Sequence, residues 1–252
     1  MDRPFTAVIP RVQMSVQGCP YPTVLEQVCE AARRACEKTL MWRYEVPKYL
    51  LTPGVHEYYY QKPANADVHV VFGATVNGSP LQVLTLEQAI AHFPAWADLY
   101  NGTDPWALTE PTVVGQSNFG EDQYNPSALA EIPPEALEGT STPTAITQIT
   151  PDKFIVLPLP NADEHLLRMW VALKPKRTAT GMEEVAFQEL EDAIMHGALE
   201  MLFALPNTTW GDKEMASYHA KKFLYATTER RARANLGNAR GALIAHNPYS
   251  VW

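Results

Sequence analysis

The sequence predicts an α+β fold in which helices near both ends of the chain flank a β-rich region. Apolar residues recur at three- and four-residue steps in two stretches, 22–42 and 183–236, which is the period of a buried helical face. Between them lie short β-rich runs separated by turn signals. We therefore expect a helical bundle, made of an N-terminal helix and a C-terminal antiparallel helical hairpin, with a β-rich lobe and a long loop-rich insertion.

The stretch from Glu183 to Leu236 predicts two helices joined by a short turn. Pro206 ends the first helix because proline cannot donate the next backbone hydrogen bond, and Asp212 is a suitable N-cap for the second, which ends near Gly237. A connection this short makes the two helices antiparallel neighbours. The apolar stripe of the first helix is Phe187, Leu190, Ile194, Ala198, Leu199 and Leu202, and the weaker stripe of the second is Met215, Ala216, Ala220, Phe223, Leu224 and Thr227.

The N-terminal part divides into an arm, a helix and several strands. Residues 1–20 alternate loosely and contain three prolines, so we expect an arm or edge strand. Pro22 suits the first turn of a helix that continues to about Trp42. Pro47 and Pro53-Gly54 mark the end of this helical region. Strands are expected at 55–60, 67–72 and 80–84.

Two local signals in this part are specific. Asn77-Gly78 is typical of a two-residue hairpin turn. Thr85 to Gln88 matches a capping box, which opens a short helix that reaches His92.

Residues 94–145 are rich in Pro, Gly, Asn, Thr and acidic side chains, and they are interpreted as a long insertion. Strands return at 145–149, 154–157 and 165–173. The expected organisation is an arm (1–20), a single domain (21–238) with a β lobe (55–173) that contains the insertion, and a C-terminal tail (239–252).

Charge is distributed unevenly along the 252 residues, whose formal net charge is −8. Between Lys62 and Lys153 there are eleven acidic residues and no lysine or arginine, whereas Lys213 to Trp252 contains seven basic residues and two acidic ones. Such asymmetry favours subunit contacts or a charged channel. Glu121, Asp122, Glu131 and Glu135 are the acidic candidates for a lumen or a subunit interface.

No secretory leader and no apolar run of about 20 residues is present, so we expect a soluble protein that is made in the cytoplasm and has no membrane partner. Cys19, Cys29 and Cys36 are expected to be small buried hydrophobic residues.

The sequence contains no recognisable catalytic, nucleotide-binding or zinc-protease motif. Asp192 and His196 lie four residues apart and supply half a metal site at most, and His219 beside Lys222 has no carboxylate ligands. We therefore predict no catalytic residue, no cofactor and no metal. An enzyme that uses Glu121 and Asp122 for glycoside hydrolysis is a distant alternative.

Arg230, Arg231 and Arg233 form a basic cluster that suggests non-specific phosphate contact, so a DNA-binding module is the second alternative. Cations near a helix C-terminus are also favourable with the helix dipole alone.

The C-terminal tail is apolar, unlike most free tails. Either it packs on its own domain or it inserts into a partner. Its candidate contact residues are Arg240, Leu243, Ile244, Tyr249, Val251 and Trp252.

The segment from Leu190 to Arg233 resembles the end of the head-to-tail adaptor proteins of tailed bacteriophages, called tail tubular protein A in short-tailed phages. The matching features are Gly197-Ala198-Leu199-Glu200-Met201-Leu202, Leu205-Pro206, Trp210 and the Ala/Arg-rich run 218–233. Cys36 to Trp42 and Leu157 to Pro160 are also similar, and the likeness covers about residues 20–95 and 145–240.

This resemblance implies a virion structural protein without enzymatic activity. It would form a ring, a dodecamer in that family, at the head–tail junction. The ring would bind the portal protein through the C-terminal tails and a downstream tail or nozzle protein on its other side. Genomic DNA would pass through the lumen during ejection without sequence-specific binding.

Overall fold

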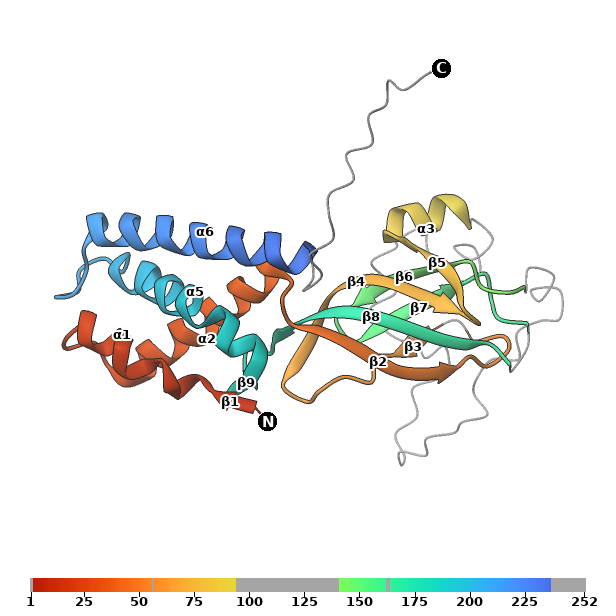
Figure 1. The fold of residues 1–252 in the computed structure, drawn as a ribbon, viewed down its shortest axis with the longest axis horizontal. Coiled ribbons are helices and arrows are strands. Elements are labelled where there is room, and N and C mark those ends of the chain that lie inside the picture. The colour runs from red at the N-terminus through yellow and green to blue at the C-terminus, as the bar shows by residue number, and fades with distance from the viewer. Residues whose placement is uncertain (1, 56, 94–140, 162–163, 237–252) are drawn as a thin grey trace, which may run out of the picture. The chain divides into compact units, whose positions relative to one another are not determined.

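The computed structural model describes residues 2–55, 57–93, 141–161 and 164–236. Within these ranges the chain has an α+β fold with five α-helices and nine strands (Figure 1). It divides into two compact units. The helical unit comprises residues 1–43, 63–67 and 172–252, and the sheet unit comprises residues 44–62 and 68–171.

The predicted helical bundle is wrong. The largest arrangement of elements is a curled, mixed seven-stranded sheet, and no helical bundle is evident in the described part of the chain. One reason is that the sheet extends further than the local pattern suggested. Strand β2 (Arg43–Leu50) runs through Pro47, where the sequence predicts the end of an element. Because β2 is an edge strand, its proline does not interrupt the sheet.

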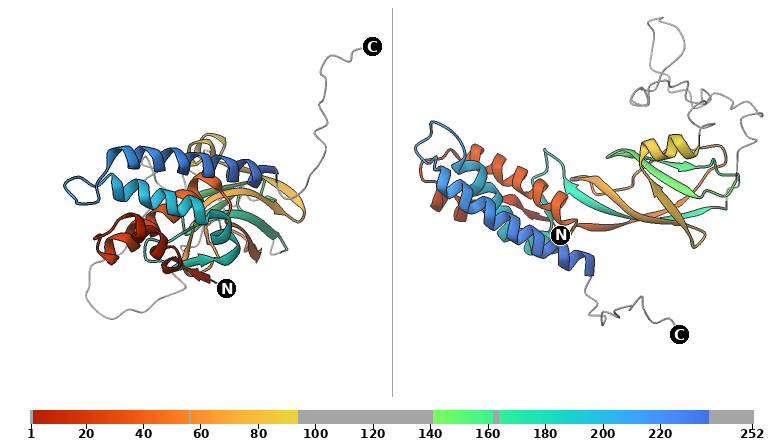
Figure 2. Two further views of the ribbon diagram at one scale, coloured as in Figure 1. Left: turned by 60° about the vertical axis from the view of Figure 1, so that its left-hand side comes forward. Right: turned by 90° about the horizontal axis from the view of Figure 1, so that it is seen from above.

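Three long helices make up most of the helical unit: α2 (Tyr21–Thr39), α5 (Glu184–Phe203) and α6 (Lys213–Leu236). Helix α5 packs against both α2 and α6, and the two views of Figure 2 show α5 and α6 side by side. Gly197 permits the close approach, since a Cβ there would lie 3.1 Å from both the Ala31 methyl group and the Phe223 ring. No helix in the described ranges is long and apolar enough to cross a membrane.

The predicted antiparallel pair of C-terminal helices and its turn are confirmed. The Asp212 carboxylate accepts hydrogen bonds from the backbone N–H groups of Glu214 (2.9 Å) and Met215 (3.1 Å), as expected of an N-cap. Asn207 adopts a positive φ of 58° just after α5, where a small polar residue tolerates the left-handed conformation.

The N-terminal residues do not form a simple arm or edge strand. Strand β1 (Asp2–Pro4) pairs antiparallel with β9 (Gly181–Glu183), and a 3₁₀ turn (Phe5–Ala7) leads into α1 (Ile9–Ser15). The apolar residues Phe5, Val8, Ile9, Val12 and Val16 are all buried. Their spacing of three and four residues is helical, so the predicted loose alternation is wrong.

The sheet unit contains most of the seven-stranded sheet, whose strand order is β2-β8-β4-β5-β6-β7-β3. Strand β5 pairs with β6 in parallel, although the two are separated by more than fifty residues in the sequence. The remaining strands are β3 (Glu57–Tyr59), β4 (Ala66–Val76), β5 (Ser79–Leu84), β6 (Ala145–Thr150), β7 (Lys153–Leu157) and β8 (Leu166–Pro175).

The predicted turn and capping box of this unit are both confirmed. Asn77 and Gly78 have φ values of 50° and 85° and connect β4 to β5. Thr85 and Gln88 make both hydrogen bonds of the capping box at the start of α3 (Leu86–His92). Helix α3 lies against β5 and β6, which buries Ala89 in a small apolar cluster (Figure 1).

The two edge strands of the sheet meet through a tyrosine. The Tyr49 hydroxyl of β2 donates to the carbonyl oxygen of Tyr59 in β3 (2.9 Å) and accepts from the backbone N–H of Gln61 (2.6 Å). The Phe154 ring of β7 contacts the rings of Tyr49, Tyr58 and Tyr60, at centroid distances of 5.5, 5.6 and 4.8 Å. The aromatic cluster thus joins β7 to the two edge strands β2 and β3.

Candidate functional site

The site residues predicted from the sequence fall outside the described residues. Glu121, Asp122, Glu131 and Glu135 lie in the range 94–140, and Arg240, Leu243, Ile244, Tyr249, Val251 and Trp252 lie in the range 237–252. The insertion predicted at 94–145 is described only from residue 141 onward. Those assignments therefore stay predictions. The candidate sites described below lie in the helical unit.

The arginine cluster of α6 is described, and two of its three members pair with carboxylates. Arg230 contacts Glu189 of α5 at 2.7 Å, and Arg233 lies 3.5 Å from both Glu189 and Glu229. Arg231 donates to the carbonyl oxygen of Lys38 in α2 at 2.9 Å. These contacts join α6 to its two helical neighbours, so a structural role accounts for the cluster better than phosphate binding.

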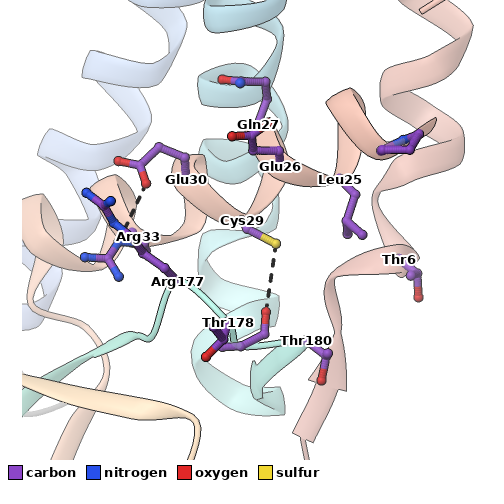
Figure 3. A pocket seen from close by; sticks show the side chains of 12 residues that line it. Thr6, Leu25, Glu26, Gln27, Cys29, Glu30, Arg33, Arg177, Thr178 and Thr180 are labelled. Atoms are coloured by element: carbon purple, nitrogen blue, oxygen red, sulfur yellow. Dashed lines mark hydrogen bonds and ion pairs between the residues drawn. The ribbon is translucent and has the colours of Figure 1, made fainter. Parts of the chain in front are cut away.

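A groove of about 640 Å³ runs along α2, beside the segment that precedes β9 (Figure 3). Most of the residues that line it are polar or charged, and Figure 3 shows Glu30 turned toward Arg33, with a closest N–O distance of 3.7 Å. The Cys29 thiol faces the carbonyl oxygen of Ala179 at 3.9 Å. Burial, and secondly the nearby Glu26 carboxylate, raises the pKa of this thiol. Since the thiolate is the nucleophile, the groove is poorly suited to cysteine chemistry.

The three cysteines are free thiols, and the two buried ones, Cys19 and Cys36, agree with the prediction of small buried residues. Cys29 is only half-buried. Burial raises the pKa of Cys36, which stabilises its neutral, unreactive form.

A histidine pair joins α5 to α6, and sequence reasoning missed it. The Nδ1 atoms of His196 and His219 lie 3.0 Å apart. The sequence places the two residues on different helices and predicts no contact between them. Two features of the sequence indicate the contact. His219 lies four residues before Phe223, so it shares the face of α6 that packs on α5, and His196 is next to Gly197, where the helices approach closely.

Burial lowers the pKa of both imidazoles. For His196 the Asp192 carboxylate opposes this effect and the Lys222 ammonium group adds to it. For His219 the neighbouring His196 lowers the pKa further. His196, Asp192 and Lys222 share a small pocket of about 180 Å³ at the edge of the α5–α6 contact. The arrangement therefore favours the neutral rings at neutral pH.

No protein-family model matches this chain, and a search of curated proteins found no relative.

Proposed function

We propose that this chain is a virion structural protein without enzymatic activity, a head-to-tail adaptor of a tailed bacteriophage. The observation that carries the proposal is the resemblance of Leu190 to Arg233 to that family. These residues form most of α5, the turn and α6. Gly197 lies at a close contact of α5 with Ala31 of α2 and Phe223 of α6, and Leu205-Pro206 follows the end of α5. The shared features thus include a glycine at the contact between packed helices and the residues that follow the end of α5.

In this proposal several copies of the chain form a ring, a dodecamer as in the family, between the portal protein and a downstream tail or nozzle protein. The uneven charge along the sequence supports a ring with a channel, because an acidic lumen repels phosphate groups and lets DNA slide. Glu121, Asp122, Glu131 and Glu135 are the proposed lumen or interface residues.

Residues 239–252 are proposed to dock into the portal protein. Leu243, Ile244, Tyr249, Val251 and Trp252 are large apolar side chains, and burying each one contributes roughly 1.5–3 kcal/mol before ordering costs. Repetition around a ring multiplies a modest single-tail affinity through avidity.

Truncation after Asn238 tests the docking element. The shortened chain should keep its helical content by circular dichroism and fail to bind DNA-filled heads that lack this protein. The Arg240→Ala variant separates the contribution of charge from that of the apolar side chains. It keeps all five apolar side chains and should bind nearly as well, because an exposed ion pair contributes about 0–1 kcal/mol. Head binding by the truncated chain at the full-length level would refute the docking role.

The ring itself is tested by native mass spectrometry, with and without the portal protein. Twelve copies of 28.1 kDa give about 340 kDa. We expect this species to be lost at high salt if charge contacts hold the ring, and to weaken when Glu121, Asp122, Glu131 and Glu135 are changed to glutamine. A chain that stays monomeric even with the portal protein would contradict the adaptor proposal.

A further inference from the structure

We propose that His196 and His219 form a pH-sensitive lock between α5 and α6, in which one shared hydrogen bond holds the helices together and double protonation of the pair breaks it. The lock is a property of the helical unit and does not depend on the proposed function.

The geometry fits one hydrogen bond, with a single proton between the two rings. The Nδ1 atoms are 3.0 Å apart and the ring centroids 5.1 Å apart, so the two nitrogens face one another. In the neutral pair one ring donates its Nδ1–H and the other accepts. A first added proton keeps this bond, because an imidazolium ion donates to the neutral partner. A second added proton places two N–H donors and two like charges face to face, and the bond is lost.

The surroundings of His219 disfavour its charged form. The side chain is only 7% exposed. The Phe203 ring stacks on it at a centroid distance of 5.6 Å and an angle of 13°, and the Tyr218 ring meets it edge-on at 5.1 Å. An imidazolium ion in this position loses most of its hydration.

The charged groups of the surrounding elements give little compensation. On α5, Asp192 favours a charged His196, but its side chain is exposed, and Glu189 is already paired with Arg230 and Arg233. On α6, Lys222 opposes the charge. Arg34 and Lys38 of α2 lie over the Phe223 ring, Arg11 of α1 pairs with Glu191, and Glu229 pairs with Arg233. Glu200 of α5 contacts Arg34 through one carboxylate oxygen, and its buried Oε2 has no hydrogen-bond partner among the described residues.

The direction of the pH effect follows from these surroundings. Burial lowers the pKa of both rings in the folded chain below the unfolded value of about 6.5. Between the two values the unfolded chain binds more protons. The stabilisation is therefore fully present above about pH 6.5 and is lost as the pH falls through the folded pKa values.

A bound metal ion explains the pair less well than a proton. In the part of the chain that the structure describes, no third His, Cys, Asp or Glu completes a ligand group around these rings. Structural zinc sites in proteins almost always have four ligands.

Hydrogen–deuterium exchange of the full chain at about pH 7.5 and about pH 5 measures the lock directly, because these values lie on either side of the histidine range. After correction for intrinsic exchange rates, protection in residues 213–234 should fall about tenfold for each unit by which the pKa of the pair is lowered. Protection of the sheet strands should change little.

A variant that lacks both histidines shows whether the loss of α6 protection at low pH comes from this pair or from a general effect of acid on the chain. His196→Leu combined with His219→Phe keeps an apolar contact and an aromatic partner for Phe203, so its α6 protection should be independent of pH. His92→Gln, at an exposed histidine in the sheet unit, is the matched control and should respond to pH like the unmodified chain.

A histidine NMR titration of the unmodified chain keeps the test valid if the double variant does not fold. We expect His196 and His219 to titrate in two coupled steps below about pH 6.5. Independent titration of both rings near pH 6.5 would overturn the proposal. The same holds for equal loss of α6 protection in the unmodified and the doubly substituted chain.

Discussion

Two buried tyrosines in the sheet unit differ in their hydrogen bonding. The Tyr49 hydroxyl makes two hydrogen bonds, whereas the Tyr60 hydroxyl is buried without a partner among the described residues. Both rings pack on Phe154. Burial raises the pKa of both phenols, so both stay neutral at physiological pH. The hydroxyl of Tyr49 therefore stabilises the fold, and that of Tyr60 costs desolvation energy.

Tyr49→Phe should lower the free energy of unfolding by about 1–3 kcal/mol, because it leaves the N–H of Gln61 and the carbonyl oxygen of Tyr59 without this partner. Tyr60→Phe is the matched control and should be neutral or stabilising. Urea denaturation of the two variants provides the measurement. Equal destabilisation by both would show that ring packing, and not hydrogen bonding, dominates this cluster.

Gly197→Val should destabilise the chain by about 1–3 kcal/mol. Three atoms of two different helices, the Ala31 methyl carbon and two Phe223 ring carbons, lie 3.1 Å from the position of a Cβ. This crowding should outweigh the loss of the glycine's conformational freedom, which favours substitution in a helix by up to about 1 kcal/mol. Gly73→Ala is the control, since a Cβ there meets nothing within 4 Å. An unchanged denaturation midpoint for Gly197→Val would mean that the helices move apart at little cost.

At the scale of the element, local signals predicted local structure well. The capping box, the Asn77-Gly78 turn and the Asp212 N-cap were all recognised, because each depends on residues within about four positions of one another.

Thr85→Ala should cost about 1 kcal/mol and act mainly on α3. The Thr85 hydroxyl accepts from the N–H of Gln88 at 3.3 Å, and the Gln88 side chain accepts from the N–H of Thr85 at 3.0 Å. Gln88→Ala should cost less because the threonine cap remains. Faster hydrogen exchange at residues 86–92 is the expected result for Thr85→Ala, and unchanged exchange there would contradict the role of the cap.

Contacts between distant segments could not be predicted from the sequence. Three such contacts bring together residues from different elements. They are the parallel pairing of β5 with β6, the pairing of β2 with β8 despite Pro47, and the hydrogen bond between His196 and His219. A periodic pattern identifies which face of an element is buried but not which partner covers it. For the same reason the helices were largely located correctly while the bundle expected from them was wrong.

At the scale of the whole molecule, each of the two units has its own buried side chains. Phe187 and Phe223 are buried in the helical unit, and Phe154 and Ile155 in the sheet unit. The chain reaches the sheet unit after α2, returns to the helical unit at residues 63–67, and returns again before α5. Neither unit is therefore one continuous segment.

Separate cores predict two thermal transitions in calorimetry, one for each unit. Gly197→Val should lower only the transition of the helical unit, and Tyr49→Phe only that of the sheet unit, by about 2–8 °C for each kcal/mol lost. Lowering the pH from about 7.5 to about 5 should also shift the helical transition downward, because the two histidines bind more protons when unfolded. A single transition that moves with both substitutions would show that the two units unfold cooperatively, and the separate assignment of the two variants would then be wrong.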